Sequence, residues 1–271
     1  RLALGDFDLD GDTDMIATHA DGFMHLRNDG AGGYAIEPTH LVAGGGALDL
    51  CDVDGDGDLD AVVGHATAGV STVINIGGVF EVESNHPDVS PAQALAFVDA
   101  GGDDLGPDLV TSDNTLGGAW IATRGADGLL HVHDSTSVDA EDELNAVTAT
   151  DIDGDGDVDL IASGDDYPKL VVMENQGDGS FDDVGQFASN ATSRAHRLAD
   201  LDGDGDLDCI IVDTAWSQLN VFEYAGNLSF VQHTDLDAGT SPRSVDVADI
   251  DGDGASDLVV ASYFSEDVTY F

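Results

Sequence analysis

The stretch DLDGDGDLD, residues 200–208, recurs in almost the same form at four other places in this chain. The other copies are DFDLDGDTD at 6–14, DVDGDGDLD at 52–60, DIDGDGDVD at 151–159 and DIDGDGASD at 249–257. All five follow the pattern D-x-D-x-D-G-x-x-D, with carboxylates at loop positions 1, 3, 5 and 9 and glycine at position 6. Calcium takes about six to eight oxygen ligands in a flexible cage, and carboxylates this close together repel one another strongly without a cation. The pattern therefore predicts a metal loop, with Ca²⁺ favoured over Mg²⁺, which demands octahedral geometry.

The loops also set a repeat. Their first aspartates, with one degenerate copy at Asp99 included, stand at positions 6, 52, 99, 151, 200 and 249, which are 46 to 52 residues apart. Alternating apolar residues precede each loop and a short apolar run follows it, as expected for two strands. Two more strands follow, joined by glycine-rich turns such as residues 175–179. Four strands in about 40–50 residues are typical of a propeller blade.

The loop, the apolar strand after it and the subsequent N-x-G-x-G-x-F together resemble the FG-GAP/VCBS repeat, which builds integrin α-subunit propellers and many surface proteins. The resemblance covers essentially all 271 residues. It implies an all-β fold, a β-propeller of four-stranded antiparallel blades. We expect one propeller domain over residues 1–271, built from repeats that start near residues 1, 46, 93, 145, 194 and 243. We expect the chain to be a piece of a longer one, with six blades favoured and a seventh, outside this sequence, as the alternative.

Carried over by position, the family's loop predicts about five structural Ca²⁺ ions per chain, each tying the first strand of a blade to the second. Position 7 is expected to give only its backbone carbonyl, so that Ala255 is acceptable there. In the third copy, Asp99–Asp108, position 3 is glycine and a residue is inserted, which predicts weak or absent metal binding. The predicted metal ligands are Asp6, Asp8, Asp10, Asp12 and Asp14; Asp52, Asp54, Asp56, Asp58 and Asp60; Asp151, Asp153, Asp155, Asp157 and Asp159; Asp200, Asp202, Asp204, Asp206 and Asp208; and Asp249, Asp251, Asp253, Ala255 and Asp257.

The formal net charge of −48 excludes several partners. Nucleic acid and anionic membranes both need a basic patch, and the chain has seven Lys and Arg residues in total. No apolar run is long enough to insert into a membrane. A high-salt or marine setting would screen the self-repulsion, and a solvated acidic surface without a specific role is the alternative. The two cysteines, Cys51 and Cys209, lie in different repeats, and we expect two buried free thiols rather than a disulfide.

A partner is expected at the loops that follow the second strand of each repeat, on the face opposite the calcium loops, because exposed aromatic residues on rigid loops commonly bind ligands. The leading hypothesis is a non-enzymatic, calcium-stabilised propeller that binds protein or glycan at a cell surface or outside the cell. One alternative is a carbohydrate-active enzyme domain such as a polysaccharide lyase; another is a purely structural repeat of an adhesin or filament. A transition-metal pair at His131 and His133 is a weaker hypothesis. The partner loops are Leu116–Trp120, Asp165–Pro168, Asp213–Trp216 and Tyr263–Phe264.

Overall fold

The structure, a computed structural model, describes residues 1–19, 21–37, 45–65, 69–86, 94–98, 107–112, 119–124, 130–132, 144–164, 169–177, 180–188 and 193–271. The regular secondary structure of these residues consists of strands, joined by loops and turns. Among them there is no helix, and so none that is long and apolar enough to cross a membrane. The strands make six antiparallel sheets in which neighbours along the chain are neighbours in the sheet. Five sheets have four strands and the last has three. The prediction of an all-β propeller built from small antiparallel blades is confirmed.

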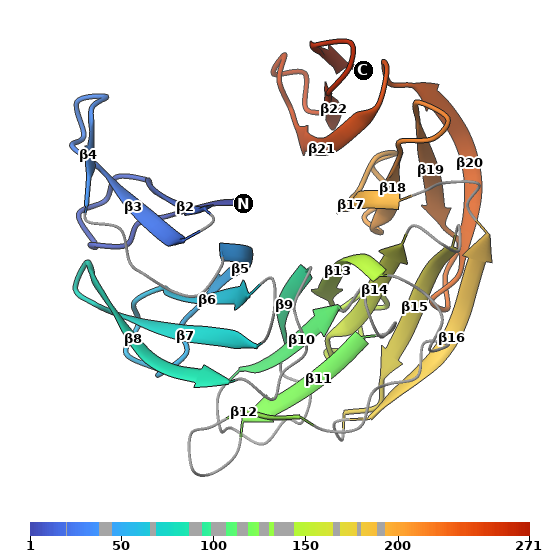
Figure 1. The fold of residues 1–271 in the computed structure, drawn as a ribbon. Coiled ribbons are helices and arrows are strands. Elements are labelled where there is room, and N and C mark those ends of the chain that lie inside the picture. The colour runs from blue at the N-terminus through green and yellow to red at the C-terminus, as the bar shows by residue number, and fades with distance from the viewer. Residues whose placement is uncertain are drawn as a thin grey trace. The chain divides into compact units, whose positions relative to one another are not determined.

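The chain divides into two compact units of three sheets each (Figure 1). The first unit holds β1 (Leu2–Gly5), β2 (Asp14–His19), β3 (Gly22–Asn28), β4 (Tyr34–Ile36), β5 (Gly45–Cys51), β6 (Asp60–His65), β7 (Val70–Ile76), β8 (Val79–His86), β9 (Ala94–Val98), β10 (Asp108–Ser112), β11 (Ala119–Arg124) and β12 (Leu130–Val132). The second unit holds β13 (Leu144–Thr150), β14 (Asp159–Gly164), β15 (Lys169–Asn175), β16 (Phe181–Ala188), β17 (Ser193–Ala199), β18 (Asp208–Asp213), β19 (Gln218–Tyr224), β20 (Phe230–Asp237), β21 (Pro242–Ala248), β22 (Asp257–Ser262) and β23 (Asp267–Tyr270).

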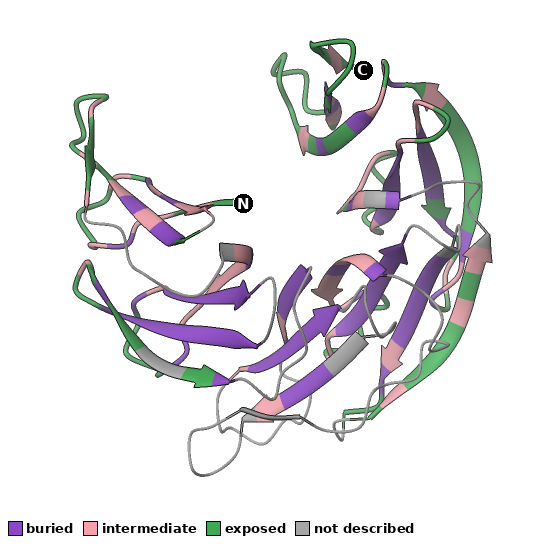
Figure 2. Ribbon diagram, in the orientation of Figure 1, coloured by how far each residue is buried: buried purple, intermediate pink, exposed green. Residues whose placement is uncertain are grey.

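Burial differs sharply between the strands of one sheet. Every residue of β6, β14 and β18, the second strands of their sheets, is buried, whereas the fourth strand β20 is mostly exposed (Figure 2). A second strand has a neighbouring strand on each edge and side chains packed against both of its faces. That position suits the short, continuously apolar runs that follow the aspartate loops, because a strand covered on both faces has no solvent side for polar residues to occupy.

The core lies between successive sheets of one unit. In the first unit β5 lies next to β1, β2 and β9, and in the second unit β17 lies next to β13, β14 and β21. Phe7 and Phe23 of the first sheet meet Phe80 of the second edge to face, with ring centroids 5.6 and 5.7 Å apart. In the second unit, Ile161 of β14 and Phe222 of β19 belong to one buried cluster. Burying these side chains supplies the main drive for stacking the sheets.

A buried polar link also joins β17 to the preceding sheet. The His196 ring lies 2.8 Å from the Ser163 Oγ through Nδ1 and 2.9 Å from the Thr148 Oγ1 through Nε2. Burial lowers the pKa of His196 to about 4, and the neighbouring Arg197 charge acts in the same direction. The ring is therefore neutral at pH 7, one nitrogen donating a hydrogen bond and the other accepting one.

Both cysteines are free thiols. Cys209 is buried, as expected, and burial raises the pKa of its thiol, so it is inert as a nucleophile. Cys51 is only half-buried, which corrects the expectation of two buried thiols. It is the last residue of β5, directly before the second aspartate loop, whose first residue, Asp52, is also only half-buried.

Candidate metal centre

The five aspartate loops fold alike because two positions in each adopt left-handed backbone. Glycine at position 6 has φ between +90° and +103° in all five loops. Position 4 also has positive φ: glycine there has φ of +80° to +83° in four loops, and Leu9 has φ of +55° in the first. A Cβ at Gly203 or Gly205 would meet nothing within 4 Å, so these glycines are needed for backbone conformation rather than for space.

Backbone N–H groups hold the carboxylates of positions 1, 3 and 5 inside the loop. In the loop Asp200–Asp208, the two oxygens of Asp200 accept from the N–H groups of Gly203 (2.7 Å) and Gly205 (3.1 Å). Asp202 accepts from the N–H of Asp204 at 3.1 Å, and Asp204 accepts from the N–H of position 7 at 2.9 Å. Each carboxylate oxygen has two lone pairs, so one accepted hydrogen bond leaves capacity for a cation.

In four of the five loops the position-9 aspartate is buried and fastens the loop to the third strand of its sheet. Asp208 is 4% exposed; its Oδ2 accepts from the N–H of Leu201 (3.1 Å) and its Oδ1 from that of Tyr224 (3.0 Å). Asp14, Asp60 and Asp159 make the same two kinds of hydrogen bond. Burial raises the pKa of Asp60 and of Asp159, although the accepted N–H bonds oppose it. A cation beside these buried carboxylates would offset the cost of keeping them charged.

Three carboxylates converge in every complete loop, with one oxygen from each lying within 4.8 Å of the others. A sphere of that size suits one ion with ligands at about 2.3–2.6 Å. The donor set consists entirely of oxygen, and the carboxylates carry more negative charge than one dication would neutralise. The residues present therefore fit Ca²⁺. The converging sets are Asp6, Asp8 and Asp10; Asp52, Asp54 and Asp60; Asp151, Asp153 and Asp159; Asp200, Asp202 and Asp204; and Asp249, Asp251 and Asp257.

The other predicted ligands lie outside these clusters. Position 5 joins the cluster in two loops and position 9 in three. Position 7 joins none, as expected if only its carbonyl is used; the side chain of Asp58 instead accepts from the N–H of Gly77 at 3.0 Å. In the degenerate third copy, Asp99–Gly106 lies outside the described residues, and Asp108 is buried at the start of β10. The side chain of His131 and all of His133 also lie outside them.

The asparagine before the glycine-rich turn supports the loop, a role that the sequence analysis did not assign to it. Asn28, Asn75 and Asn175 each end or nearly end a third strand, and each donates its side-chain amide to the carbonyl of loop position 8, at 3.0, 3.2 and 3.1 Å. Tyr224 stands at this place in the fifth sheet. The signal was present in the sequence, because these residues follow the position-9 aspartate by 14 to 16 residues in every case.

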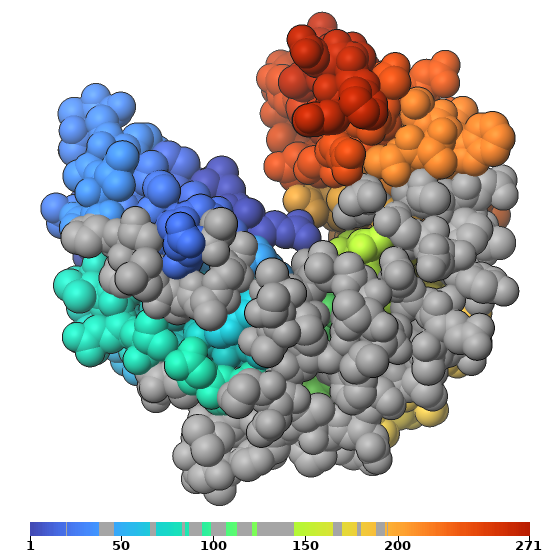
Figure 3. All heavy atoms as spheres, viewed as in Figure 1, coloured from blue at the N-terminus to red at the C-terminus, as the bar shows by residue number. Residues whose placement is uncertain are grey.

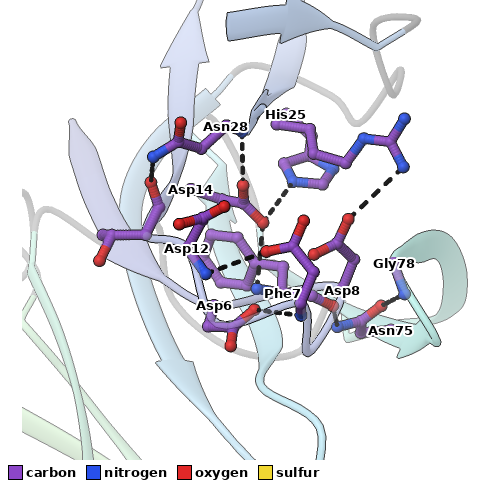
Figure 4. Close-up of polar contacts among 12 residues, drawn as sticks. Asp6, Phe7, Asp8, Asp12, Asp14, His25, Asn28, Asn75 and Gly78 are labelled. Atoms are coloured by element: carbon purple, nitrogen blue, oxygen red, sulfur yellow. Dashed lines mark hydrogen bonds and ion pairs between the residues drawn. The ribbon is translucent and has the colours of Figure 1, made fainter. Parts of the chain in front are cut away.

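The first loop has additional neighbours (Figure 4). The guanidinium Nη1 of Arg27 lies 3.4 Å from Asp8 Oδ2, and the His25 Nε2 lies 3.5 Å from Asp14 Oδ2. From the second sheet, Asn75 donates to the carbonyl of Phe7 at 2.7 Å, so the turn after β7 packs on this loop. A Cβ on Gly78 in that turn would come within 2.8 Å of the Asp8 Cβ, which requires glycine there.

Comparison with known proteins agrees with this geometry. Residues 151–211 and 200–260 match the family model of the FG-GAP-like repeat. Residues 151–260 therefore carry FG-GAP-like repeats, and the small antiparallel sheets that follow one another along the chain are those of a β-propeller. No curated protein matches the sequence.

Several solved structures share the fold at low sequence identity. A lectin of Agrocybe aegerita that recognises non-reducing terminal N-acetylglucosamine is similar, with a TM-score of 0.62 and 19% identity over 96% of this chain and 74% of the lectin. BBS1N, solved in complex with ARL6DN, has a TM-score of 0.68 and 13% identity over 100% of this chain and 78% of that one. The V. cholerae biofilm matrix protein Bap1 has a TM-score of 0.51 and 20% identity over 91% of this chain and 40% of Bap1. At these identities the likeness establishes the fold alone.

Proposed function

We propose that the chain is a calcium-stabilised, non-enzymatic β-propeller that binds a protein or glycan partner outside the cell or at its surface. The observation that carries the proposal is the convergence of three carboxylates in each of five loops. Every such loop joins the first strand of a sheet to the second, and in four of the five the position-9 aspartate accepts a hydrogen bond from the third strand. A bound Ca²⁺ would therefore fix three strands of a blade together, and extracellular calcium at millimolar concentration suits exposed sites of this kind.

Partner binding is assigned to the turns between second and third strands. In an antiparallel sheet these turns lie at the end opposite the first-to-second-strand loops, which leaves them free of the metal sites. Propellers of similar fold support a binding role in general, since one is a lectin and another was solved in complex with a protein. Of the predicted partner loops, Asp213–Trp216 and Tyr263–Phe264 are described, and most of the other two lies outside the described residues.

Metal analysis combined with thermal unfolding tests the calcium part. The purified protein is dialysed against calcium, and its bound metal is counted by mass spectrometry before and after chelation with EDTA. We expect about five Ca²⁺ per chain, and a fall in Tm of about 5–10 °C for each site that was occupied at roughly 100 times its Kd. Restoring Ca²⁺ should restore Tm, and Mg²⁺ should restore less. An unchanged Tm after complete chelation would overturn the proposal.

A further inference from the structure

An aromatic platform stands at one end of the last two sheets, away from their aspartate loops. It consists of Trp216 in the turn between β18 and β19, and of Tyr263 and Phe264 in the turn between β22 and β23. Their side chains are 69%, 65% and 70% exposed, which is unusual for three large rings of one region. In the space-filling view the last sheet, in red, adjoins the preceding sheet, in orange (Figure 3). Both sheets belong to the second unit.

The turns that carry these rings are fastened to one another through the connection between β20 and β21. Ser217 accepts from the N–H of Ala238 at 3.0 Å through its carbonyl. On the other side, the N–H groups of Tyr263 and Phe264 donate to the carbonyls of Ser241 (3.0 Å) and Thr240 (3.2 Å). These hydrogen bonds connect the three turns into one platform. Binding a ligand would therefore not cost the entropy of ordering the turns.

The backbone of the platform is strained at three places. Ser217, Ser241 and Glu266 have φ of +59°, +58° and +54°, a left-handed conformation that residues other than glycine rarely adopt. One such residue lies in each of the three connected turns. Strained non-glycine residues persist where the surrounding structure holds them, and they concentrate at ligand sites. The Ser265 hydroxyl supplies part of that support, because it accepts from the N–H of Thr240 at 3.1 Å.

Tyr263 and Phe264 are also held in position by their neighbours while they remain mostly exposed. Tyr263 and Phe264 pack edge to face with centroids 5.1 Å apart, and the Arg243 guanidinium lies 5.5 Å from the Tyr263 ring centroid. Glu266 and Asp267 are exposed beside them. All three rings are exposed on two neighbouring turns, and the Arg243 guanidinium lies over one face of Tyr263. An open ring face flanked by charged hydrogen-bonding groups suits a sugar, whose C–H face stacks on the ring while its hydroxyls bond to the rim.

We propose that Trp216, Tyr263 and Phe264 form a binding site for a neutral glycan. The ligand is neutral because a chain of net charge −48, with carboxylates at Glu266 and Asp267 next to the rings, repels uronate and sialic acid polymers. This inference rests on the proposed binding function and assigns it a site and a ligand class. It does not depend on the metal loops, because the platform lies at the opposite end of both sheets.

Binding is tested with a panel of immobilised neutral oligosaccharides ending in glucose, galactose, mannose or N-acetylglucosamine, with uronate and sialylated oligosaccharides alongside. The proteins are the wild type, Trp216→Ala and Tyr263→Ala. The matched control is Tyr34→Ala, which removes an exposed ring from β4 of the first unit. We expect the wild type and the control to bind a neutral member, and each platform variant to lose about tenfold or more in affinity. Calcium content and Tm should stay unchanged in all four proteins.

Since Trp216 is one of two tryptophans, the variant Trp120→Phe leaves it as the sole indole reporter, and the same sugar should change its fluorescence. Equal glycan binding by the wild type and both platform variants would overturn the site and leave the proposed binding function standing. Binding only to charged glycans would overturn the ligand class. A wild type that binds no glycan would overturn this inference as a whole, while the calcium count and a protein-partner screen would still decide the proposed function separately.

Discussion

The loops Asp6–Asp14 and Asp200–Asp208 share one motif and differ in what surrounds it. Both carry left-handed glycine at position 6 and a buried aspartate at position 9. Beside position 3, however, the first loop has the Arg27 guanidinium, 3.4 Å from Asp8. In the other loop the N–H of Asp204 acts to lower the pKa of Asp202, but desolvation and the charges of Asp204, Asp208 and Glu223 outweigh it, and the pKa is raised.

The two loops also differ at position 4, where Leu9 adopts a left-handed conformation that Gly203 adopts without strain. The first loop therefore carries a cation of its own and some backbone strain, whereas the loop Asp200–Asp208 has uncompensated negative charge on a relaxed backbone. The ligand motif alone does not determine how much a bound metal stabilises a loop. The charged side chains around the loop also contribute. We expect calcium to stabilise the loop Asp200–Asp208 more than the first loop.

The largest difference is expected from the position-9 variants Asp208→Asn and Asp14→Asn. Each replaces a carboxylate that accepts two backbone N–H bonds by an amide that can accept only through its oxygen. In EDTA each variant should lose about 3 kcal/mol of unfolding free energy. Asp208 lies outside the converging set of its loop, but the repeat pattern predicts it as a ligand. In calcium Asp208→Asn should therefore lose about 3 kcal/mol more, the contribution of one site at 100 times its Kd, and Asp14→Asn should lose less.

Urea unfolding in EDTA and in calcium measures both losses. Asp206→Asn is the matched control, because position 7 is expected to use only its carbonyl and should bind calcium normally with either side chain. Equal calcium-dependent losses in the two position-9 variants would remove the proposed difference between the loops.

Acid should weaken the region of the loop Asp200–Asp208 by a route that does not involve its carboxylates. His196 on β17, the strand that leads into this loop, has a pKa of about 4 when folded and an ordinary value of 6.5 when unfolded. As pH falls below about 6.5, His196 binds a proton in the unfolded chain but not in the folded chain. The free energy of unfolding therefore decreases between about pH 6.5 and 4. The loss from this group between pH 7 and 5 is about 2 kcal/mol.

Unfolding in EDTA at pH 7 and pH 5 measures this loss, and His196→Gln should flatten it. His233→Gln, at a ring 64% exposed, is the control for the loss of a histidine at the surface of the same sheet. If His196→Gln keeps the full pH dependence, the acid effect lies in the carboxylates and the loops must be compared at one pH only.

A smaller effect is expected at position 4. Gly203→Ala adds a Cβ that meets nothing within 4 Å, so its cost of about 1 kcal/mol comes from the left-handed backbone. Gly203→Asn should cost less, since asparagine tolerates this region better. Leu9→Gly should be neutral or stabilising, because the strain it relieves offsets the entropy glycine adds to the unfolded chain. Thermal unfolding in EDTA ranks the three variants by stability. A lower Tm for Leu9→Gly would show that the Leu9 side chain stabilises the fold by more than its backbone strain costs.

The fold was predictable because the motif and the strand pattern repeat in phase. Period-two alternation before each loop and short apolar runs after it fix the first two strands, and the glycine-rich turns fix the third and fourth. The convergence of carboxylates also follows from spacing alone. Whether 1–271 forms one domain stays a prediction.

The side chains that contact the loop residues from other strands were not predictable in the same way. Arg27 comes close to Asp8 only because β3 returns beside the loop, and Asn75 reaches the carbonyl of Phe7 from the next sheet, 68 residues away in sequence. Leu9 itself gives no sign of its left-handed φ, which only the glycines at position 4 of the other four loops indicate. These features depend on tertiary contacts, which local propensity does not record.

The smallest predicted effect tests the charge of Arg27 directly. Arg27→Gln removes a cation that is half exposed, so the pair with Asp8 is worth no more than about 0.2–1 kcal/mol. Without it the first loop should bind Ca²⁺ up to about fivefold more tightly, because the ion no longer competes with the guanidinium. Calorimetric calcium titration at low salt should show the gain, and about 1 M salt should reduce it. Arg197→Gln is the control, since that side chain is 49% exposed and lies 3.6 Å from Asp246, outside any loop. A gain of the same size in the control would mean that net charge, rather than the contact with Asp8, sets calcium affinity, and the two loops would then differ only in their backbones.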